Sequence, residues 1–355
     1  MIIQDMEIEI NKTSHSRLEE SDIDNCPFGR IFSDHMLEMD FIDGKWTKPV
    51  IKPYQNLDMS PASMVFHYGQ AIFEGMKAYR FEDGSVGLFR AIDNIKRMNI
   101  SAHRMSMPEL PEDVFFEALK ALIDLDREWI PSNPSSSLYI RPVMFATDDF
   151  VGVKASKNYK FLIFTSPANA YYTKPVKVKI ETHYSRSCHG GTGFAKAAGN
   201  YAASMYPAKL ANDAGYDQLI WTDAETHKYV EEAGTMNVMF VINGELLTPP
   251  SSDTILDSIT RKSAVTLAKQ LGIPVQERMI SVEEILEAIK NGTLEEAFGA
   301  GTAATIAPIS HIAYEDMEFE LEDPNTWKIA PAILNELNNI RKGKVEDRNN
   351  WVTLV

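Results

Sequence analysis

Three short turn sequences constrain the fold of this chain more than any other feature. Asp43-Gly44, Asp83-Gly84 and Asn243-Gly244 each stand between two segments rich in apolar, β-branched or aromatic residues. Such pairs supply the positive φ angles of a tight hairpin turn, so each pair predicts two antiparallel strands joined directly. Neighbouring parallel strands need a long crossover connection instead. We therefore expect an α/β (α+β) chain with mixed or antiparallel sheets and flanking helices, and not a doubly wound parallel sheet.

The length and the periodicity of the chain predict two domains. Its 355 residues exceed the size of about 250–300 residues at which a single core stops growing. Prolines and weak periodicity mark a break near residues 166–178. We expect an N-terminal α/β domain over 1–168, a linker over 169–179 and a C-terminal domain over 180–355. Apolar periodicity and terminal signals predict helices over 92–105, 112–127, 196–213, 255–273, 282–290 and 327–341.

Charge and composition exclude several classes of protein. The formal net charge of −15 argues against nucleic acid and against anionic membrane surfaces, because both need a basic face. The first 20 residues lack the basic start and apolar run of a signal peptide, and no stretch reaches the length of a membrane span. We expect a cytoplasmic protein. The two cysteines, Cys26 and Cys188, share no short spacing, so neither a metal site nor a disulfide framework is indicated.

The stretch "HGGTGFAKAAGNY" surrounds Lys196 with glycine and alanine. A phosphate-binding loop needs Gly before the lysine and Ser or Thr after it, and Ala195 and Ala197 fail that test. The later segment "GAGTAA" (299–304) satisfies the relaxed dinucleotide pattern, but a poor helix start follows it. A non-catalytic nucleotide-binding α/β protein therefore stays only as an alternative.

A lysine among small side chains suits a flat aldehyde cofactor. A neutral lysine amine is a strong nucleophile toward carbonyl groups and forms Schiff bases. Pyridoxal phosphate also needs a carboxylate at its ring nitrogen, amides or arginine at its phosphate, and small neighbours at its faces. The segments "VEEAGTMN" (230–237), "DSITRKS" (257–263) and "FGAGTAAT" offer these groups.

Taken in order along the chain, these segments resemble the branched-chain amino-acid aminotransferases, the fold-type IV pyridoxal-phosphate enzymes. The resemblance runs from about Phe28 to the C-terminal tryptophan segment. It rests on seven blocks: "HYGQAIFEGMKAYR", "LFRAIDNIKRM", "LYIRPV", "FAKAAGNY", "EEAGTMN", "SITRKSAVTLAKQLGI" and "FGAGTAA". The family's fold is the expected one: two domains with the cofactor in the cleft between them.

The resemblance implies a role for each cofactor-binding residue. Lys196 is the expected catalytic residue, which forms the Schiff base with pyridoxal 5'-phosphate and moves the substrate proton. Glu232 would pair with the pyridine nitrogen and Tyr201 would bond the ring hydroxyl. The phosphate would be held by the remaining members of the set: Arg90, Ile259, Thr260 and Thr302.

The resemblance also implies a substrate pocket. An aromatic wall for a branched aliphatic side chain is expected from Phe32, Phe73, Tyr139, Tyr171 and the partner subunit's Tyr68. The α-carboxylate would lie on the amides of Thr302 and Ala303. Because an apolar pocket cannot hold a bare charge, Arg141 is expected to receive the second carboxylate of glutamate.

The family implies reversible amino transfer between leucine, isoleucine or valine and 2-oxoglutarate, by at least a homodimer. Two relatives with the same fold, D-amino-acid aminotransferase and aminodeoxychorismate lyase, are the alternatives. Some eukaryotic members carry a Cys-x-x-Cys pair after the Gly-Thr-Ala turn, whereas this chain has "GTAATIAP" there. No thiol switch is therefore expected. The sequence leaves open the role of residues 1–25.

Overall fold

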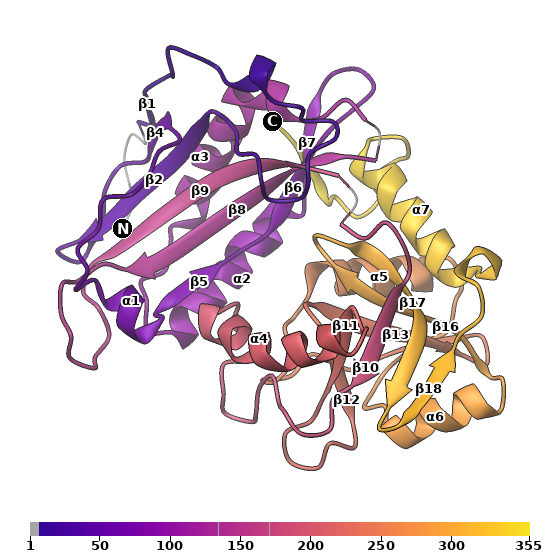
Figure 1. Ribbon diagram of the computed structural model, residues 1–355. Coiled ribbons are helices and arrows are strands. Elements are labelled where there is room, and N and C mark those ends of the chain that lie inside the picture. Colours follow the sequence, from indigo (N-terminus) through magenta and orange to yellow (C-terminus); the bar gives the residue numbers. More distant parts are fainter. Residues whose placement is uncertain (1–6, 134, 170) are drawn as a thin grey trace. The chain divides into compact units, whose positions relative to one another are not determined.

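The computed structural model describes residues 7–133, 135–169 and 171–355, and it divides into two compact units (Figure 1). The first unit reaches Tyr171 and takes in residues 195–199 and Ile340–Val355, and the second holds Tyr172–Phe194 and Asn200–Asn339. The boundary at Tyr171 falls inside the predicted linker. Two segments differ from the predicted division, because Lys196 and the C-terminal residues belong to the first unit. Residues 1–6 of the N-terminal stretch lie outside the described part.

The first unit is a ten-stranded sheet with helices. Its sheet order is β1-β4-β2-β9-β8-β6-β7-β19, with β3 on β2 and β5 on β8, and every described pairing but β1–β4 is antiparallel. The strands are β1 Glu9–Ile10, β2 His35–Ile42, β3 Lys45–Trp46, β4 Val50–Pro53, β5 Ala71–Phe73, β6 Met76–Arg80, β7 Val86–Phe89, β8 Ser137–Ala146, β9 Tyr159–Ala168 and β19 Val352–Leu354. The helices are η1 Leu18–Glu20, α1 Met64–Tyr68, α2 Ala91–Arg104, α3 Glu112–Leu125 and η2 Arg127–Trp129.

Helices α2 and α3 close the core of this unit against the sheet (Figure 1). Phe115 of α3 and Phe161 of β9 are fully buried, and their rings meet edge to face with centroids 4.9 Å apart. Such a pair adds to the free energy gained by apolar burial. This packing fixes β9, which pairs with β8, the strand that carries Tyr139 and Arg141.

The second unit is a nine-stranded mixed sheet. Its order is β12-β11-β10-β17-β16-β13-β14-β15, with β18 on β17, and β10 runs parallel to both neighbours. The strands are β10 Val176–Ile180, β11 Gln218–Thr222, β12 Val230–Ala233, β13 Met236–Ile242, β14 Glu245–Thr248, β15 Val275–Glu277, β16 Leu294–Gly301, β17 Thr305–Tyr314 and β18 Met317–Glu320. The helices are α4 Ala198–Asp213, α5 Ile259–Gln270, α6 Val282–Lys290, η3 Pro324–Thr326 and α7 Ile329–Arg341; α4 and α7 each begin in one unit and end in the other.

The predicted hairpins and the mixed sheets are confirmed. Asp43-Gly44 and Asn243-Gly244 both adopt positive φ angles, 51° and 77° in the first pair and 51° and 74° in the second. In the third hairpin only Gly84 has a positive φ, and the turn is wider than two residues. Asp83 contributes through its side chain there, since its carboxylate accepts bonds from the Ser85 amide and hydroxyl at 2.9 and 2.6 Å.

Serine caps set the starts of α5 and α6. The helix predicted from residue 255 begins at Ile259, because the Ser258 hydroxyl caps it by accepting from the Arg261 amide. At the start of α6, Ser281 accepts from the Glu284 amide at 3.0 Å, but the Glu284 carboxylate binds Arg278, so only half of a capping box is formed.

Candidate active site

Lys196 lies in a short extended segment before α4. Its amide donates to the Ser101 hydroxyl at 2.9 Å, and its carbonyl accepts from the Phe73 amide at 3.1 Å. Ala197 forms a bridge with Ile72 at the edge of β5. The Lys196 Nζ atom lies 4.9 Å from the centre of the Phe73 ring. The backbone of the lysine is thus fixed, whereas its side chain runs along an aromatic face.

The alanines beside Lys196 explain the small residues of this stretch. Ala195 and Ala197 are each 1% exposed and belong to the core of the first unit. A larger side chain at either position would overpack that core. The small residues therefore fit the lysine segment against the sheet, which is a packing reason that sequence reasoning did not identify.

A buried ion pair lies next to this lysine. Arg97 holds the fully buried Glu74 with two bonds, Nε to Oε1 at 2.7 Å and Nη2 to Oε2 at 2.8 Å. Asn94 Nδ2 and the Gly75 amide also donate to Glu74 Oε2, at 2.8 and 3.1 Å. Burial alone would raise the pKa of Glu74, but the charges of Arg97 and Lys196 and these bonds hold that pKa below its ordinary value.

Arg141 and Tyr139 form the polar end of an aromatic cluster on β8. Arg141 Nη2 donates to the Tyr139 hydroxyl at 3.0 Å, and the guanidinium lies 4.8 Å from the centre of the Phe73 ring. The buried Nε of Arg141 has no hydrogen-bond partner among the described residues. A Cβ atom at Gly75 would overlap the Tyr139 hydroxyl, so only glycine leaves room for that side chain. The structure thus joins three predicted pocket residues, Phe73, Tyr139 and Arg141.

Of the other predicted pocket residues, Tyr171 is linked to this cluster through Phe28, whereas Phe32 and Tyr68 make other contacts. Tyr171 contacts Phe28 edge to face at 5.1 Å, and Phe28 contacts Tyr139 at 4.9 Å. Phe32 stacks on Tyr54 at 5.1 Å in the irregular segment before β2. Tyr68, on α1, is 39% exposed and donates to the Val151 carbonyl.

Arg90 caps α2 in a strained conformation. Its φ of 51° lies in the left-handed region, which is uncommon for arginine. Its amide donates to the Trp351 carbonyl at 2.6 Å, and its guanidinium lies 5.0 Å from the Trp351 ring centre. Asp93 accepts from Arg90 Nε at 2.6 Å. The C-terminal strand β19, which the sequence did not predict, therefore helps to fix the backbone and side chain of Arg90.

Glu232 is the buried carboxylate of the second unit. It lies on β12 at 4% exposure, and its Oε1 accepts from the Leu256 amide at 2.9 Å and from Asn237 Nδ2 at 3.3 Å. Arg186 Nε lies 2.6 Å from Oε2, in a geometry too bent for a hydrogen bond. The neighbouring Glu231 is also buried, and burial raises its pKa.

The remaining predicted cofactor residues lie in the second unit. Ile259 and Thr260 occupy the first turn of α5 after the Ser258 cap. Backbone amides at the start of a helix attract anions. Thr302 and Ala303 form the turn between β16 and β17. Tyr201 is half-buried on α4. Lys196 and Arg90 thus belong to one unit, and Glu232 and the amide groups belong to the other.

Sequence reasoning missed several residues that hold these groups. The missed residues are Glu74, Arg97, Ser101 and Arg186. Ser101 and Arg186 contact the predicted residues Lys196 and Glu232, whereas Glu74 follows Phe73 and binds Arg97. Glu74 stands in the apolar segment "AIFEGMKAY", and this position could have predicted a buried carboxylate with a charged partner, because buried charges need partners. Nothing in the sequence pointed to Ser101 or Arg186, whose partners lie far away along the chain.

Comparison with known proteins places this arrangement in a class. Residues 71–312 match the family described as amino-transferase class IV. Branched-chain-amino-acid transaminase 1 of Bacillus subtilis (strain 168) is 46% identical over 98% of this chain and 99% of its own length. The chain belongs to the class IV aminotransferase family, among the branched-chain amino-acid aminotransferases.

Solved structures agree in fold. The branched-chain aminotransferase of Thermoproteus uzoniensis, solved with norvaline, has a TM-score of 0.74 at 26% identity, over 90% of this chain and 99% of that one. The enzyme from Thermobaculum terrenum in its PLP form has a TM-score of 0.71 at 24% identity, over 90% and 98%. The expected fold-type IV architecture is therefore confirmed.

Within the described residues, no helix is both long and apolar enough to cross a membrane.

Proposed function

We propose that this chain is a branched-chain amino-acid aminotransferase that uses pyridoxal 5'-phosphate. It transfers the amino group reversibly between leucine, isoleucine or valine and 2-oxoglutarate. The observation that carries the proposal is the fixed Lys196 backbone beside Phe73, in a chain that is 46% identical to a curated transaminase over nearly its whole length.

The residues of the site fit the cofactor by their chemistry. An amine on a fixed backbone suits an aldehyde, and the Arg90 guanidinium and the first-turn amides of α5 suit a phosphate. The buried carboxylate of Glu232 suits a protonated ring nitrogen. Bound pyridoxal phosphate supplies an electron sink for the electron pair left at the substrate Cα.

The side chains and amides of the protein move the substrate Cα proton and bind the charged groups of cofactor and substrate. Lys196 removes the proton from the substrate Cα as a general base. Glu232 keeps a proton on the ring nitrogen, and Tyr201 bonds the ring hydroxyl. The amides of Thr302 and Ala303 hold the α-carboxylate. The enzyme returns to its first form only after the second substrate delivers an amino group, so the kinetics are ping-pong.

The aromatic cluster explains how two unlike substrates share one pocket. Phe73 and Tyr139 of this cluster, with Phe32 outside it, present apolar faces to a branched side chain. Tyr171 and the partner subunit's Tyr68 complete the wall. Arg141 receives the side-chain carboxylate of glutamate, and its buried Nε without a hydrogen-bond partner supports this role. The active unit is at least a homodimer in the cytoplasm, and neither nucleic acid nor a membrane is a partner.

The function is tested with Lys196→Ala and with Lys209→Ala, an exposed lysine on α4, as the matched control. Wild type and Lys209→Ala should transaminate leucine with 2-oxoglutarate and should gain cofactor mass on Lys196 after borohydride treatment. Lys196→Ala should do neither, because its nucleophile is gone. An adduct on Lys196→Ala would overturn the lysine assignment. A preference of wild type for D-alanine or aminodeoxychorismate would favour the alternative enzymes of the same fold.

A further inference from the structure

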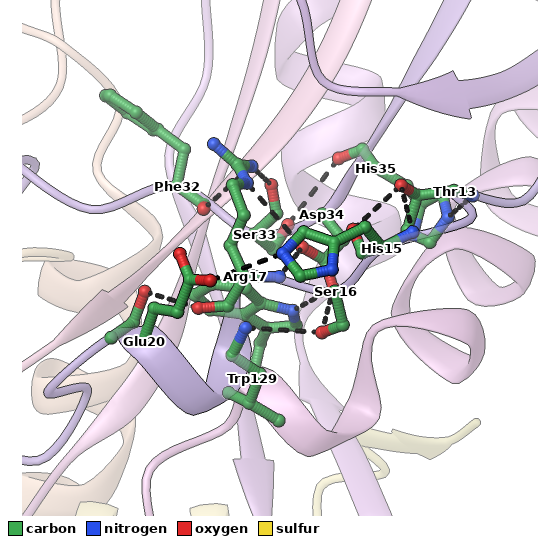
Figure 2. A network of polar contacts seen from close by, with 12 residues as sticks. Thr13, His15, Ser16, Arg17, Glu20, Phe32, Ser33, Asp34, His35 and Trp129 are labelled. Atoms are coloured by element: carbon green, nitrogen blue, oxygen red, sulfur yellow. Dashed lines mark hydrogen bonds and ion pairs between the residues drawn. The ribbon is translucent and has the colours of Figure 1, made fainter.

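The N-terminal strap, residues Thr13–Ser21, is bound to the first unit through polar contacts, most of which Figure 2 draws. At its start the Thr13 amide donates to His35 Nε2 at 2.9 Å, and His35 Nδ1 lies 2.6 Å from Asp126 Oδ1. Because Nε2 accepts a bond, Nδ1 carries the proton and donates to the aspartate. The segment before the strap pairs with the same unit, as β1 on β4.

Asp34 anchors the middle of the strap. Its carboxylate accepts from the Arg17 amide at 2.9 Å, from the Ser16 hydroxyl at 2.6 Å and from Trp129 Nε1 at 3.0 Å. Burial would raise the pKa of Asp34, but these donors and the Arg17 charge hold that pKa below its ordinary value. The backbone of Arg17 is therefore fixed over a buried, charged acceptor.

The Arg17 side chain uses this anchor to grip the segment before β2. Its Nη2 donates to the Ser33 carbonyl at 2.5 Å and to the Phe32 carbonyl at 3.2 Å. Its guanidinium lies 5.6 Å from the centre of the Tyr54 ring, on which Phe32 stacks at 5.1 Å. Phe32 itself lies outside any strand or helix, so no ladder of backbone bonds fixes it.

We infer that Arg17 is a positioning residue for the Phe32 wall of the substrate pocket. This inference rests on the proposed function, since it takes Phe32 as a pocket residue. Arg17 holds both the carbonyl of Phe32 and the ring on which Phe32 stacks. Loss of these contacts leaves Phe32 free to shift. The apolar side chain of a substrate such as leucine then loses its close fit against the Phe32 ring. Glutamate depends on Arg141 for its side chain and is less sensitive to that shift.

The test compares Arg17→Met, Arg17→Lys and Glu20→Ala in the full-length holoenzyme. Methionine keeps the apolar stem but removes the donors, and lysine restores donors to the carbonyls. Glu20→Ala is the control, because it removes only an exposed contact within the strap, the one between His15 and Glu20. For each variant, kcat and KM are measured separately with L-leucine and with L-glutamate.

Arg17→Met should lower the ratio of kcat/KM for leucine to that for glutamate by about tenfold, the scale on which an apolar pocket separates substrates differing by one methylene group. The loss should appear mainly in the KM for leucine, Arg17→Lys should recover part of it, and Glu20→Ala should match wild type. An unchanged ratio, or equal losses of kcat for both substrates, overturns the inference. If wild type lacks leucine activity, the proposed function itself has failed.

Discussion

Each unit of this protein contains a buried glutamate that lies next to an arginine, and these two pairs differ in geometry. In the first unit, Arg97 meets Glu74 with two parallel bonds, and Asn94 and Gly75 add two more donors. In the second unit, Arg186 lies 2.6 Å from Glu232, but its Nε makes no hydrogen bond within the described residues.

The donors of Arg186 are directed elsewhere. Its Nη2 donates to the carbonyls of Gly193 and Thr254, at 3.0 and 2.8 Å. Arg186 therefore supplies charge to Glu232 without occupying it with a bidentate pair, whereas Arg97 occupies both oxygens of Glu74. We therefore expect the Glu74 pair to serve the fold, whereas Glu232 keeps its predicted role at the ring nitrogen of the cofactor. The comparison predicts opposite outcomes when the two glutamates are changed.

The largest expected effect is on the stability of the first pair. Glu74→Gln should lower the free energy of unfolding by about 3–5 kcal/mol, because it leaves Arg97 buried without a counter-charge. Glu128→Gln is the control, since Glu128 pairs with Arg80 at 68% exposure, and such pairs contribute about 0–1 kcal/mol. Urea unfolding of the two variants measures both values. Equal, small losses would show that the Glu74 pair is not structural.

The second pair should respond in turnover. Glu232→Gln should lower kcat for leucine by about a hundredfold or more, because a positioned charge at the reacting centre is lost. Its free energy of unfolding should fall by less than that of Glu74→Gln, since Arg186 keeps its bonds to two carbonyls. Steady-state kinetics measure the kcat of Glu232→Gln, and urea unfolding of the same preparation measures its free energy of unfolding. A variant that unfolds easily but retains full kcat would reverse the two roles.

The smallest effect is the acid response of the first pair. The pKa of Glu74 is lowered from 4.5 in the folded chain, so the unfolded chain binds more protons as the pH falls. The stability that its ionisation provides is complete above pH 4.5 and is lost as the pH falls through the folded pKa. Wild type should therefore lose up to about 1.4 kcal/mol per pH unit more than Glu74→Gln below pH 4.5. Parallel curves for the two proteins would contradict this.

Local features of the sequence predicted much of the fold. Turn residues set the hairpins at Asp43-Gly44 and Asn243-Gly244, and Ser281 begins α6 as expected. These features depend on neighbours within a few residues, which sequence patterns record. The ordered blocks of the resemblance supplied the cofactor and the reaction class, which the comparisons support.

Features that depend on distant contacts could not be predicted. Lys196 precedes α4 because its backbone bonds to Phe73 and Ser101, which lie about a hundred residues away along the chain. The same holds for the grip of Arg17 on Phe32 and for the pairing of β19 with β7. The roles of the individual site residues stay predictions until the variants are measured.

The pairing of β19 beside Arg90 has a consequence for the order of events during synthesis. Arg90 is made long before Trp351 and Val352, which fix its surroundings. Domains fold as they emerge, N-terminal parts first. Arg90, for which we predict a role in phosphate binding, therefore acquires its final environment only after Trp351 has been made, and a chain truncated before Trp351 should lack that environment.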